Sequence, residues 1–225
     1  MTPHKMDRDA IRKGAFIDIM REGERLGLVT IASKSERRAT LNQILEARPK
    51  SSGIWVFGYG SLMWNPAMNV TDKRLGRVYG LHRCYRISSP IGRGMPENPG
   101  LTLCLDQGGS VTGMALRLDR KSEEEELSIL WDREMITGAY NARWVTVMTE
   151  DGPVPAITFV ANRDHPRYVD KQSDDKIVKT LAIAEGCLGT AHDYLKQTIC
   201  ELGKLGWHAT ELHALEKRVS RYNQE

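Results

Sequence analysis

Two features of the sequence carry residue types suited to acid–base chemistry beside an anion-binding loop. The first is segment 55–62 (WVFGYGSL), in which a short apolar run leads into Gly58-Tyr59-Gly60. A loop with glycine at every second position can expose several backbone N–H groups at one point. Such groups suit a carboxylate, a phosphate or a developing oxyanion. The alternative is that the loop is only a sharp turn.

The second feature is Glu134, which falls on the apolar face of a helix expected over residues 121–135. At about 100° per residue, Glu134 lies roughly 20° from Leu127 and inside the arc of the large apolar side chains. Burial would raise the pKa of this carboxyl group and bring it closer to neutral pH, where it both accepts and donates protons efficiently. The alternative is a buried structural ion pair with an arginine near position 133 or with Arg143.

The four glutamates at 123–126 differ from Glu134. They occupy the first turn of the same helix, where negative charge interacts favourably with the helix dipole. The sequence therefore predicts a solvent-exposed cap at these positions and not a site.

The glycine loop does not match nucleotide-binding or serine-nucleophile motifs. Position 63 is methionine where a Rossmann fingerprint or a nucleophile elbow has glycine, and the lysine of a P-loop is missing. Ser61 as a nucleophile would need an adjacent base, and no histidine lies nearby in sequence. The histidines and cysteines show no H-x-H, HExxH or C-x-x-C spacing, so we expect no metal site.

Three further residues are candidate ligand contacts. Tyr140 and Tyr194 offer hydroxyl groups, with simple packing as the alternative. Gly92-Arg93-Gly94 would place Arg93 in a pocket wall, or it is only a flexible loop.

Composition excludes several classes of protein. The chain has 225 residues, of which 27% are charged. Its net charge of +3 is small and its basic residues form no continuous stripe, so we do not expect nucleic-acid binding. No window approaches about 18 consecutive apolar residues, and the N-terminus lacks an apolar segment, so we expect neither a membrane span nor a secretory signal. The four cysteines are widely spaced, which predicts reduced thiols and a cytoplasmic setting.

The elements that must position these residues run in the order helices, strands around one helix, then helices. Residues 1–48 have a helical pattern, and residues 50–53 are typical of a linker. Strands are expected at 54–59, 78–87, 101–105, 110–118, 143–148 and 156–160, with hairpin turns at 106–109 and 152–153 and a loop at 88–100. Further helices are expected at 174–186, 191–203 and 209–222. Without regular βαβ alternation, the pattern predicts an α+β domain at residues 53–225 and a helical N-terminal extension at residues 1–52.

Three segments together resemble a known family. Segment 55–64 (WVFGYGSLMW) resembles the opening strand and loop of the ChaC proteins, the glutathione-specific γ-glutamylcyclotransferases. Segment 130–135 (LWDREM), followed by Gly138-Ala139-Tyr140, is similar to the end of that family's catalytic helix. Segment 189–195 is similar to its C-terminal helix motif. The resemblance runs over residues 53–203, and longer bacterial members carry a comparable N-terminal extension.

The resemblance implies a small mixed β-barrel with flanking helices. It also implies conversion of glutathione, the expected small-molecule partner, to 5-oxoproline and cysteinylglycine without metal or organic cofactor. It assigns the general acid/base role to Glu134. The substrate-binding residues it suggests are Val56, Phe57, Gly58, Tyr59, Gly60, Ser61 and Leu62, with Tyr140 and Tyr194.

The sequence is also compatible with two other functions. The same fold can act on other γ-glutamyl peptides or γ-glutamylamines, since only the leaving amine differs. The chain can also be a non-catalytic regulatory protein linked to cation transport, although the acid at position 134 weighs against that interpretation.

Overall fold

Two long antiparallel strands form the centre of the fold. The computed structural model describes residues 6–50 and 53–224 of the chain. In it, β2 (Val70–Ser89) pairs with β3 (Gly100–Leu118) along nearly the whole length of both strands. Leucine and β-branched side chains recur in both segments, and such side chains favour a half-buried extended backbone. Most of β3 is buried, and α6 and α7 pack against it.

The hairpin turn expected at residues 106–109 is not formed, and that prediction is wrong. Gly108 and Gly109, with φ angles of 99° and 68°, form a bulge opposite Gly80, and the strand continues through them. Glycine adopts positive φ at little cost, so the extra residue is absorbed without ending the ladder. A Gly-Gly pair is typical of both a turn and a bulge, which is why sequence alone does not separate them.

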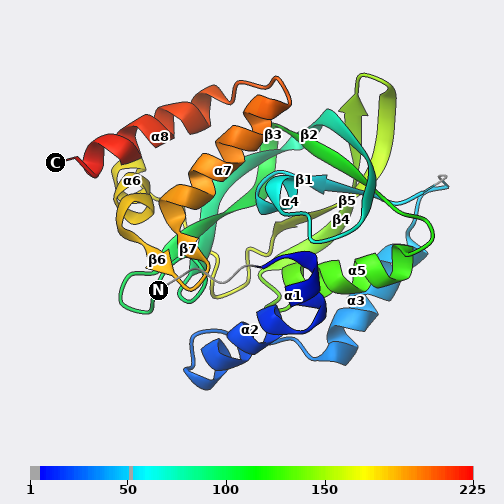
Figure 1. Ribbon diagram of the computed structural model, residues 1–225, viewed down its shortest axis with the longest axis horizontal. Helices are drawn as coiled ribbons and strands as arrows, with labels where there is room; N and C mark the ends of the chain where they lie inside the picture. Colours follow the sequence, from blue (N-terminus) through cyan, green and yellow to red (C-terminus); the bar gives the residue numbers. More distant parts are fainter. Residues whose placement is uncertain (1–5, 51–52, 225) are drawn as a thin grey trace.

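The barrel closes around a short first strand. β1 (Trp55–Gly58) pairs antiparallel with β3 and parallel with β5 (Gly152–Ala161). β4 (Tyr140–Thr149) joins β5 to β2, so the strand order is β1-β3-β2-β4-β5 (Figure 1). Phe57 and Phe159 are fully buried in the apolar core. The mixed barrel with flanking helices that the resemblance implied is therefore confirmed.

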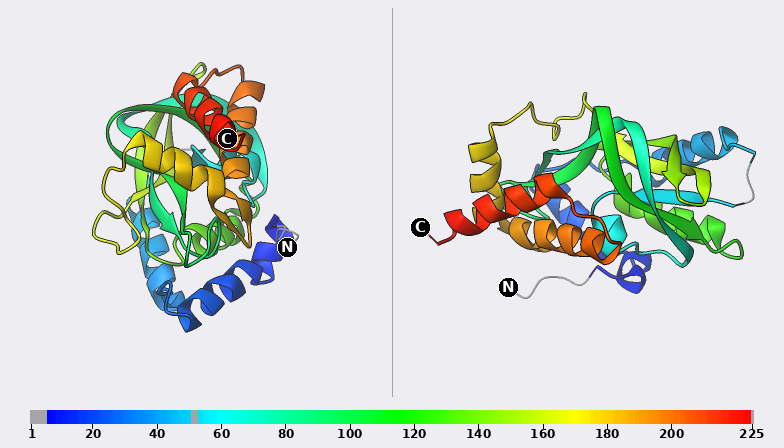
Figure 2. Two further views of the ribbon diagram at one scale, coloured as in Figure 1. Left: turned by 90° about the vertical axis from the view of Figure 1, so that its left-hand side faces the viewer. Right: turned by 90° about the horizontal axis from the view of Figure 1, so that it is seen from above.

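Helices lie on two opposite sides of the barrel. The helices and the two shortest strands are α1 (Arg8–Arg12), α2 (Ala15–Arg25), α3 (Lys34–Glu46), α4 (Ser61–Trp64), α5 (Glu123–Glu134), α6 (Asp174–Ile183), β6 (Glu185–Gly186), β7 (Gly189–Thr190), α7 (Ala191–Lys204) and α8 (Thr210–Tyr222). Figure 2 shows α7 and α8 on one side and α1, α2 and α3 on the other. Among the described residues, no helix has the length and apolar character that crossing a membrane requires.

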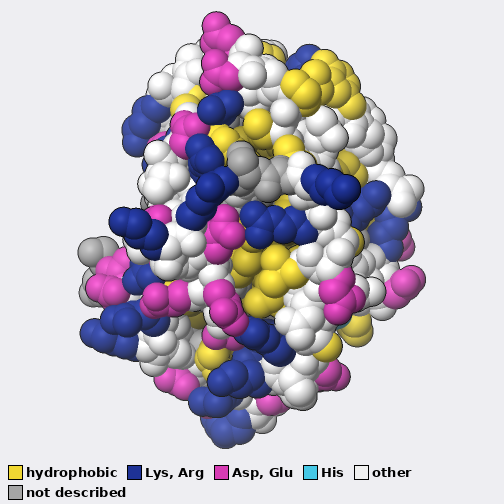
Figure 3. All heavy atoms as spheres, turned by 90° about the vertical axis from the view of Figure 1, so that its right-hand side faces the viewer, with side chains coloured by type: hydrophobic (Ala, Val, Ile, Leu, Met, Phe, Trp, Pro, Cys, Tyr) yellow, Lys and Arg dark blue, Asp and Glu magenta, His cyan; other side chains and the backbone are white. Residues whose placement is uncertain are grey.

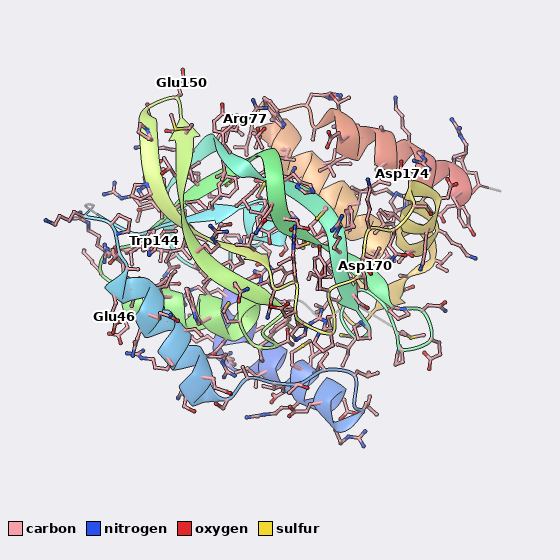
Figure 4. The ribbon with its side chains drawn as sticks, turned by 180° about the vertical axis from the view of Figure 1, so that it is seen from behind. Glu46, Arg77, Trp144, Glu150, Asp170 and Asp174 are labelled. Carbon is pink, nitrogen blue, oxygen red and sulfur yellow. The ribbon has the colours of Figure 1, made fainter. Side chains whose placement is uncertain are left out.

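The N-terminal helices pack directly on the barrel and on α5. Trp144 of β4 donates an indole N–H hydrogen bond of 2.7 Å to the carbonyl of Ile44 on α3 (Figure 4). Arg37 of α3 donates a 3.0 Å hydrogen bond to Asp132 of α5. These contacts join α3 to the barrel and to α5. Residues 51–52 of the expected linker lie outside the described residues.

Glu126 of α5 is fully buried, so the expectation of a solvent-exposed cap at 123–126 is wrong for this residue. Arg8 of α1 donates to its carboxylate at 2.6 and 3.1 Å, and the backbone and side-chain amides of Asn69 donate at 3.0 and 2.9 Å. Burial opposes ionisation, but these hydrogen bonds outweigh it and lower the pKa of Glu126. The partners lie 118 and 57 residues away in sequence, beyond the reach of a helical pattern.

Charged side chains of both signs are interspersed on the face shown in Figure 3. Nucleic-acid-binding proteins usually present a continuous basic surface. This face does not present one, in agreement with the small net charge of +3.

Arg8→Met should lower the free energy of unfolding by about 3 kcal/mol, because it leaves the buried carboxylate of Glu126 without its cation. Urea unfolding followed by circular dichroism measures the loss. Arg38→Met is the matched control: Arg38 pairs with Glu124 at 2.8 Å, but the two side chains are 54% and 78% exposed. We expect that substitution to cost about 0.5 kcal/mol. Equal losses in the two variants would contradict the assignment of Arg8–Glu126 as a buried anchor.

Candidate active site

The glycine loop leaves the barrel at the end of β1, where buried hydrogen bonds fix it. The hydroxyl of Tyr59 donates a 2.7 Å hydrogen bond to the carbonyl of Phe159 on β5. The hydroxyl of Thr158 donates a 3.0 Å hydrogen bond to the carbonyl of Phe57 on β1. The one-turn helix α4 begins at Ser61, so the loop is anchored at both of its ends.

Arg83 of β2 determines the direction of one peptide group in this loop. Its Nε donates to the carbonyl of Tyr59 at 2.7 Å, and its Nη2 donates to the carbonyl of Thr112 at 2.7 Å. A trans peptide is planar, so its C=O and N–H point in opposite directions. Because the Tyr59 carbonyl faces Arg83, the N–H of Gly60 points away from Arg83 and is available to another acceptor.

Glu134 is the last residue of α5, and its carboxyl group is largely buried. The side chain is 15% exposed, and Oε1 lies 3.0 Å from Nε of Arg133. Burial raises the pKa of Glu134, and the charge of Arg133 opposes that rise. An ion pair is therefore present, with Arg133 as the partner, while Arg143 is exposed on β4.

Arg133 connects Glu134 to the glycine loop. Its Nη2 donates a 2.7 Å hydrogen bond to the hydroxyl of Ser61, and its Nη1 donates to the carbonyl of Asn65 just beyond α4. A guanidinium presents donors in a rigid planar fork, so these bonds orient the group as well as holding it. The carboxyl group and the loop are therefore held at a defined distance by one side chain.

Glu134 and the loop meet at a small inner pocket. The pocket has a volume of about 30 Å³, and its wall includes Tyr59, Gly60, Ser61, Leu62 and Glu134. That volume suits one small polar group, such as a carboxylate or a carbonyl oxygen. A larger cavity of about 690 Å³ adjoins it and shares Ser61 and Glu134. The larger volume lies in the usual range for small-molecule sites.

Tyr140 and Tyr194 line both cavities. The hydroxyl of Tyr140 donates a 3.1 Å hydrogen bond to the carbonyl of Leu103, and the ring of Tyr194 packs edge-on against Trp64 with a centroid separation of 6.0 Å. Burial raises the pKa of both tyrosines. Both hydroxyl groups are therefore neutral near pH 7. The hydroxyl of Tyr194 can donate a hydrogen bond to a ligand, whereas that of Tyr140, whose one proton is given to Leu103, can accept one.

Three of the residues that sequence reasoning placed at the substrate lie in β1. Val56 and Phe57 are completely buried, and neither they nor Gly58 line the inner pocket or the larger cavity. In this structure they form the strand that supports the loop, while Tyr59, Gly60, Ser61 and Leu62 face the inner pocket.

The N-terminal helices supply a wall of the larger cavity that no sequence pattern indicated. Ile11 of α1 and Phe16 and Met20 of α2 line it, together with Trp64 and Arg167 from the domain. An apolar periodicity marks a face that is buried, but it does not show what that face covers. Only the packing of α1 and α2 against the rest of the fold reveals that they line this cavity.

Gly60→Ala should destabilise the fold, because a Cβ at this position would lie 2.6 Å from the hydroxyl oxygen of Tyr194. We expect the free energy of unfolding to fall by about 1–3 kcal/mol. The same substitution should cost less in a Tyr194→Phe background, since the hydroxyl group is then gone. Gly203→Ala is the control, because a Cβ there meets no atom within 4 Å. Equal costs in the two backgrounds, measured by chemical unfolding, would mean that the loop and Tyr194 are not in contact.

Comparison with known proteins places this arrangement in a family. Residues 54–222 match the family profile described as ChaC-like protein. The chain is 41% identical over 190 residues to the glutathione-specific gamma-glutamylcyclotransferase of Escherichia coli K12, which covers 84% of this chain and 82% of that protein. It is 30% identical over 156 residues to glutathione-specific gamma-glutamylcyclotransferase 1 of Homo sapiens, covering 65% and 70% of the two chains.

A solved structure shows the same fold at lower sequence identity. The crystal structure of a glutathione-specific gamma-glutamyl cyclotransferase from yeast superposes with a TM-score of 0.70 at 20% identity, covering 76% of this chain and 97% of that chain. The profile and the Escherichia coli relative each extend over most of the present sequence. The chain therefore belongs to the ChaC family.

Proposed function

We propose that this protein is a glutathione-specific γ-glutamylcyclotransferase, which releases 5-oxoproline and cysteinylglycine from glutathione. The observation that carries the proposal is the inner pocket, where the buried carboxyl group of Glu134 and the glycine loop face the same small volume. Relatives that align over most of the chain bear this activity in their names. The adjoining cavity of about 690 Å³ has room for the rest of a tripeptide.

The first step is removal of a proton from the α-ammonium group of the γ-glutamyl residue. Glu134 is the proposed base, because its carboxylate lines the inner pocket. Its negative charge also attracts the ammonium group. Burial raises the pKa of Glu134, which moves it toward that of the amine and makes the transfer less unfavourable. The charge of Arg133 opposes this rise in pKa and favours the ionised form, which is the form that accepts the proton.

The freed amine then attacks the γ-carbonyl carbon of the same glutamyl residue and closes a five-membered lactam. Nucleophile and electrophile belong to one molecule, so a pocket that holds them in the reactive geometry removes several kcal/mol of barrier. The carbonyl oxygen gains negative charge in this step. Backbone N–H groups of the loop from Tyr59 to Leu62 are the proposed donors, each worth about 3 kcal/mol. Arg83 contributes indirectly, by holding the Tyr59–Gly60 peptide in place.

The tetrahedral intermediate collapses by breaking the C–N bond to cysteine. Glu134, now protonated, gives its proton to the departing amine. The ring nitrogen still carries two protons after the attack, and one of them passes through the ionised Glu134 to the same amine, so that cysteinylglycine leaves with an ammonium group. The same carboxyl group therefore acts as base and then as acid, and it ends the cycle ionised. A pKa between those of an ordinary carboxyl group and an amine serves both steps.

We further propose that the reaction takes place in the cytoplasm. Cys84, Cys104, Cys187 and Cys200 are all free thiols. Unpaired cysteines are typical of proteins from a reducing compartment.

Glu134→Gln should lower the turnover of glutathione by at least about 10³-fold, because the amide neither accepts nor returns the proton. Release of 5-oxoproline, followed by mass spectrometry, measures the rate. Binding of glutathione, measured by calorimetry, should stay within about tenfold of the unsubstituted protein, since the shape of the pocket is kept. Glu124→Gln on the same helix is the control, because that side chain is 78% exposed. Turnover of Glu134→Gln at the parent rate would refute the role of Glu134.

The pH dependence of kcat should report Glu134. Only the ionised form accepts the proton, so kcat falls as the pH drops through the raised pKa of this group. Arg133→Met removes the charge that lowers this pKa, so the acid limb should move to higher pH. Arg133→Lys keeps the charge, and its limb should move less. If the acid limb of the kcat profile does not move in Arg133→Met, a group other than Glu134 controls that limb.

A further inference from the structure

Arg93 is a partly buried cation in the wall of the larger cavity. It belongs to the segment that connects β2 to β3. Among the described residues, no carboxylate lies within ion-pairing distance of it. Asp193 is close enough to favour the charged form of Arg93, but the two do not form an ion pair.

The donors of this guanidinium are largely unused. Nη1 donates one long hydrogen bond of 3.3 Å to the carbonyl of Thr190, and Nε and Nη2 have no acceptor among the residues described. Burial lowers the pKa of Arg93, which means that the surroundings disfavour its charge. A guanidinium in such surroundings is normally paired, so an anionic ligand group is the expected partner.

The position of Arg93 is well defined by its neighbours. The guanidinium carbon lies 5.4 Å from the ring centroid of Tyr194 and 5.8 Å from that of Trp64. The backbone N–H of Arg93 donates a 2.9 Å hydrogen bond to the hydroxyl of Ser89, and Leu188 donates a 2.9 Å hydrogen bond to the carbonyl of Gly92. The segment thus lies against the β6–β7 hairpin (Figure 1). A side chain packed against two rings loses less entropy on binding an anion than a free one does.

Arg93 faces the outer part of the site and not the part where the chemistry takes place. It lines the larger cavity but not the inner pocket, whereas Glu134, Tyr140 and Tyr194 line both. A γ-glutamyl group held at Glu134 and the glycine loop would direct its leaving group into the larger cavity. Arg133, a second guanidinium in this wall, is already paired with Glu134 at 3.0 Å.

We propose that Arg93 binds the C-terminal carboxylate of the leaving dipeptide and so selects γ-glutamyl peptides that end in a free carboxylate over γ-glutamylamines. This inference rests on the proposed function, since it assumes cleavage of a γ-glutamyl bond at Glu134. Arg167 is a third guanidinium in the same wall. Its Nε and Nη1 are engaged by the carbonyl of Ser88 at 2.7 Å and the hydroxyl of Thr137 at 3.1 Å, so fewer of its donors are free.

The test compares glutathione with an analogue in which the glycyl carboxylate is a primary amide. The two compounds have nearly the same size and differ in the charge at that end. We expect the unsubstituted protein to prefer glutathione by about 10- to 100-fold in kcat/KM, the effect of one charge-assisted contact, mainly through KM. Arg93→Met should lower kcat/KM for glutathione by a similar factor and for the amide by less than about threefold. Arg93→Lys should recover part of the preference, because it restores the charge without the planar fork.

The outcomes separate this inference from the proposed function. Arg143→Met, which changes an exposed arginine of β4, is the matched control and should keep the full preference. If the unsubstituted protein cleaves glutathione without preference over the amide, or if Arg93→Met keeps the preference, Arg93 is not the contact. If the preference disappears in Arg167→Met and persists in Arg93→Met, the inference is overturned in favour of Arg167. If the unsubstituted protein releases no 5-oxoproline from glutathione, the proposed function itself fails.

Discussion

The candidate site depends on the contacts that Arg133 makes with both Glu134 and the segment that begins at Ser61. One nitrogen lies 3.0 Å from Glu134, and the two others hold Ser61 and Asn65 at either end of α4. Burial and the C-terminal end of a helix both disfavour a carboxylate, and an adjacent guanidinium compensates for part of that cost. The same side chain thus opposes the effect of burial on the pKa of Glu134 and holds the acid next to the glycine loop.

The rest of the fold fixes the two partners of that interaction. The loop cannot shift easily, because β1 is paired on both edges and Arg83 holds the Tyr59 carbonyl. Helix α5 is anchored at its other end, where buried Glu126 accepts hydrogen bonds from Arg8 and Asn69. The N-terminal helices therefore stabilise the helix that carries Glu134 and also line the cavity into which a leaving group would extend.

Local patterns predicted the parts of the site that depend on local structure. The strand before Gly58 and the apolar helix face that carries Glu134 could be predicted, because each depends only on residues that are close together in the sequence. The bulge at Gly108 and the burial of Glu126 were not, since turn residues and first-turn acids are each compatible with two environments. The pairing of Arg133 with Glu134 and the wall formed by the N-terminal helices depend on tertiary packing. A single sequence carries little information about such contacts.

The most direct test of this account is the titration of Glu134 itself, followed by NMR in protein labelled with carbon-13 at the glutamate side-chain carboxyls. The resonance of Glu134 is the one that is missing from the spectrum of Glu134→Gln. We predict that this resonance titrates with a pKa above that of an ordinary glutamate, because burial outweighs the charge of Arg133. A Glu134 resonance that titrates at or below the ordinary value would contradict a buried proton-transferring acid at this position.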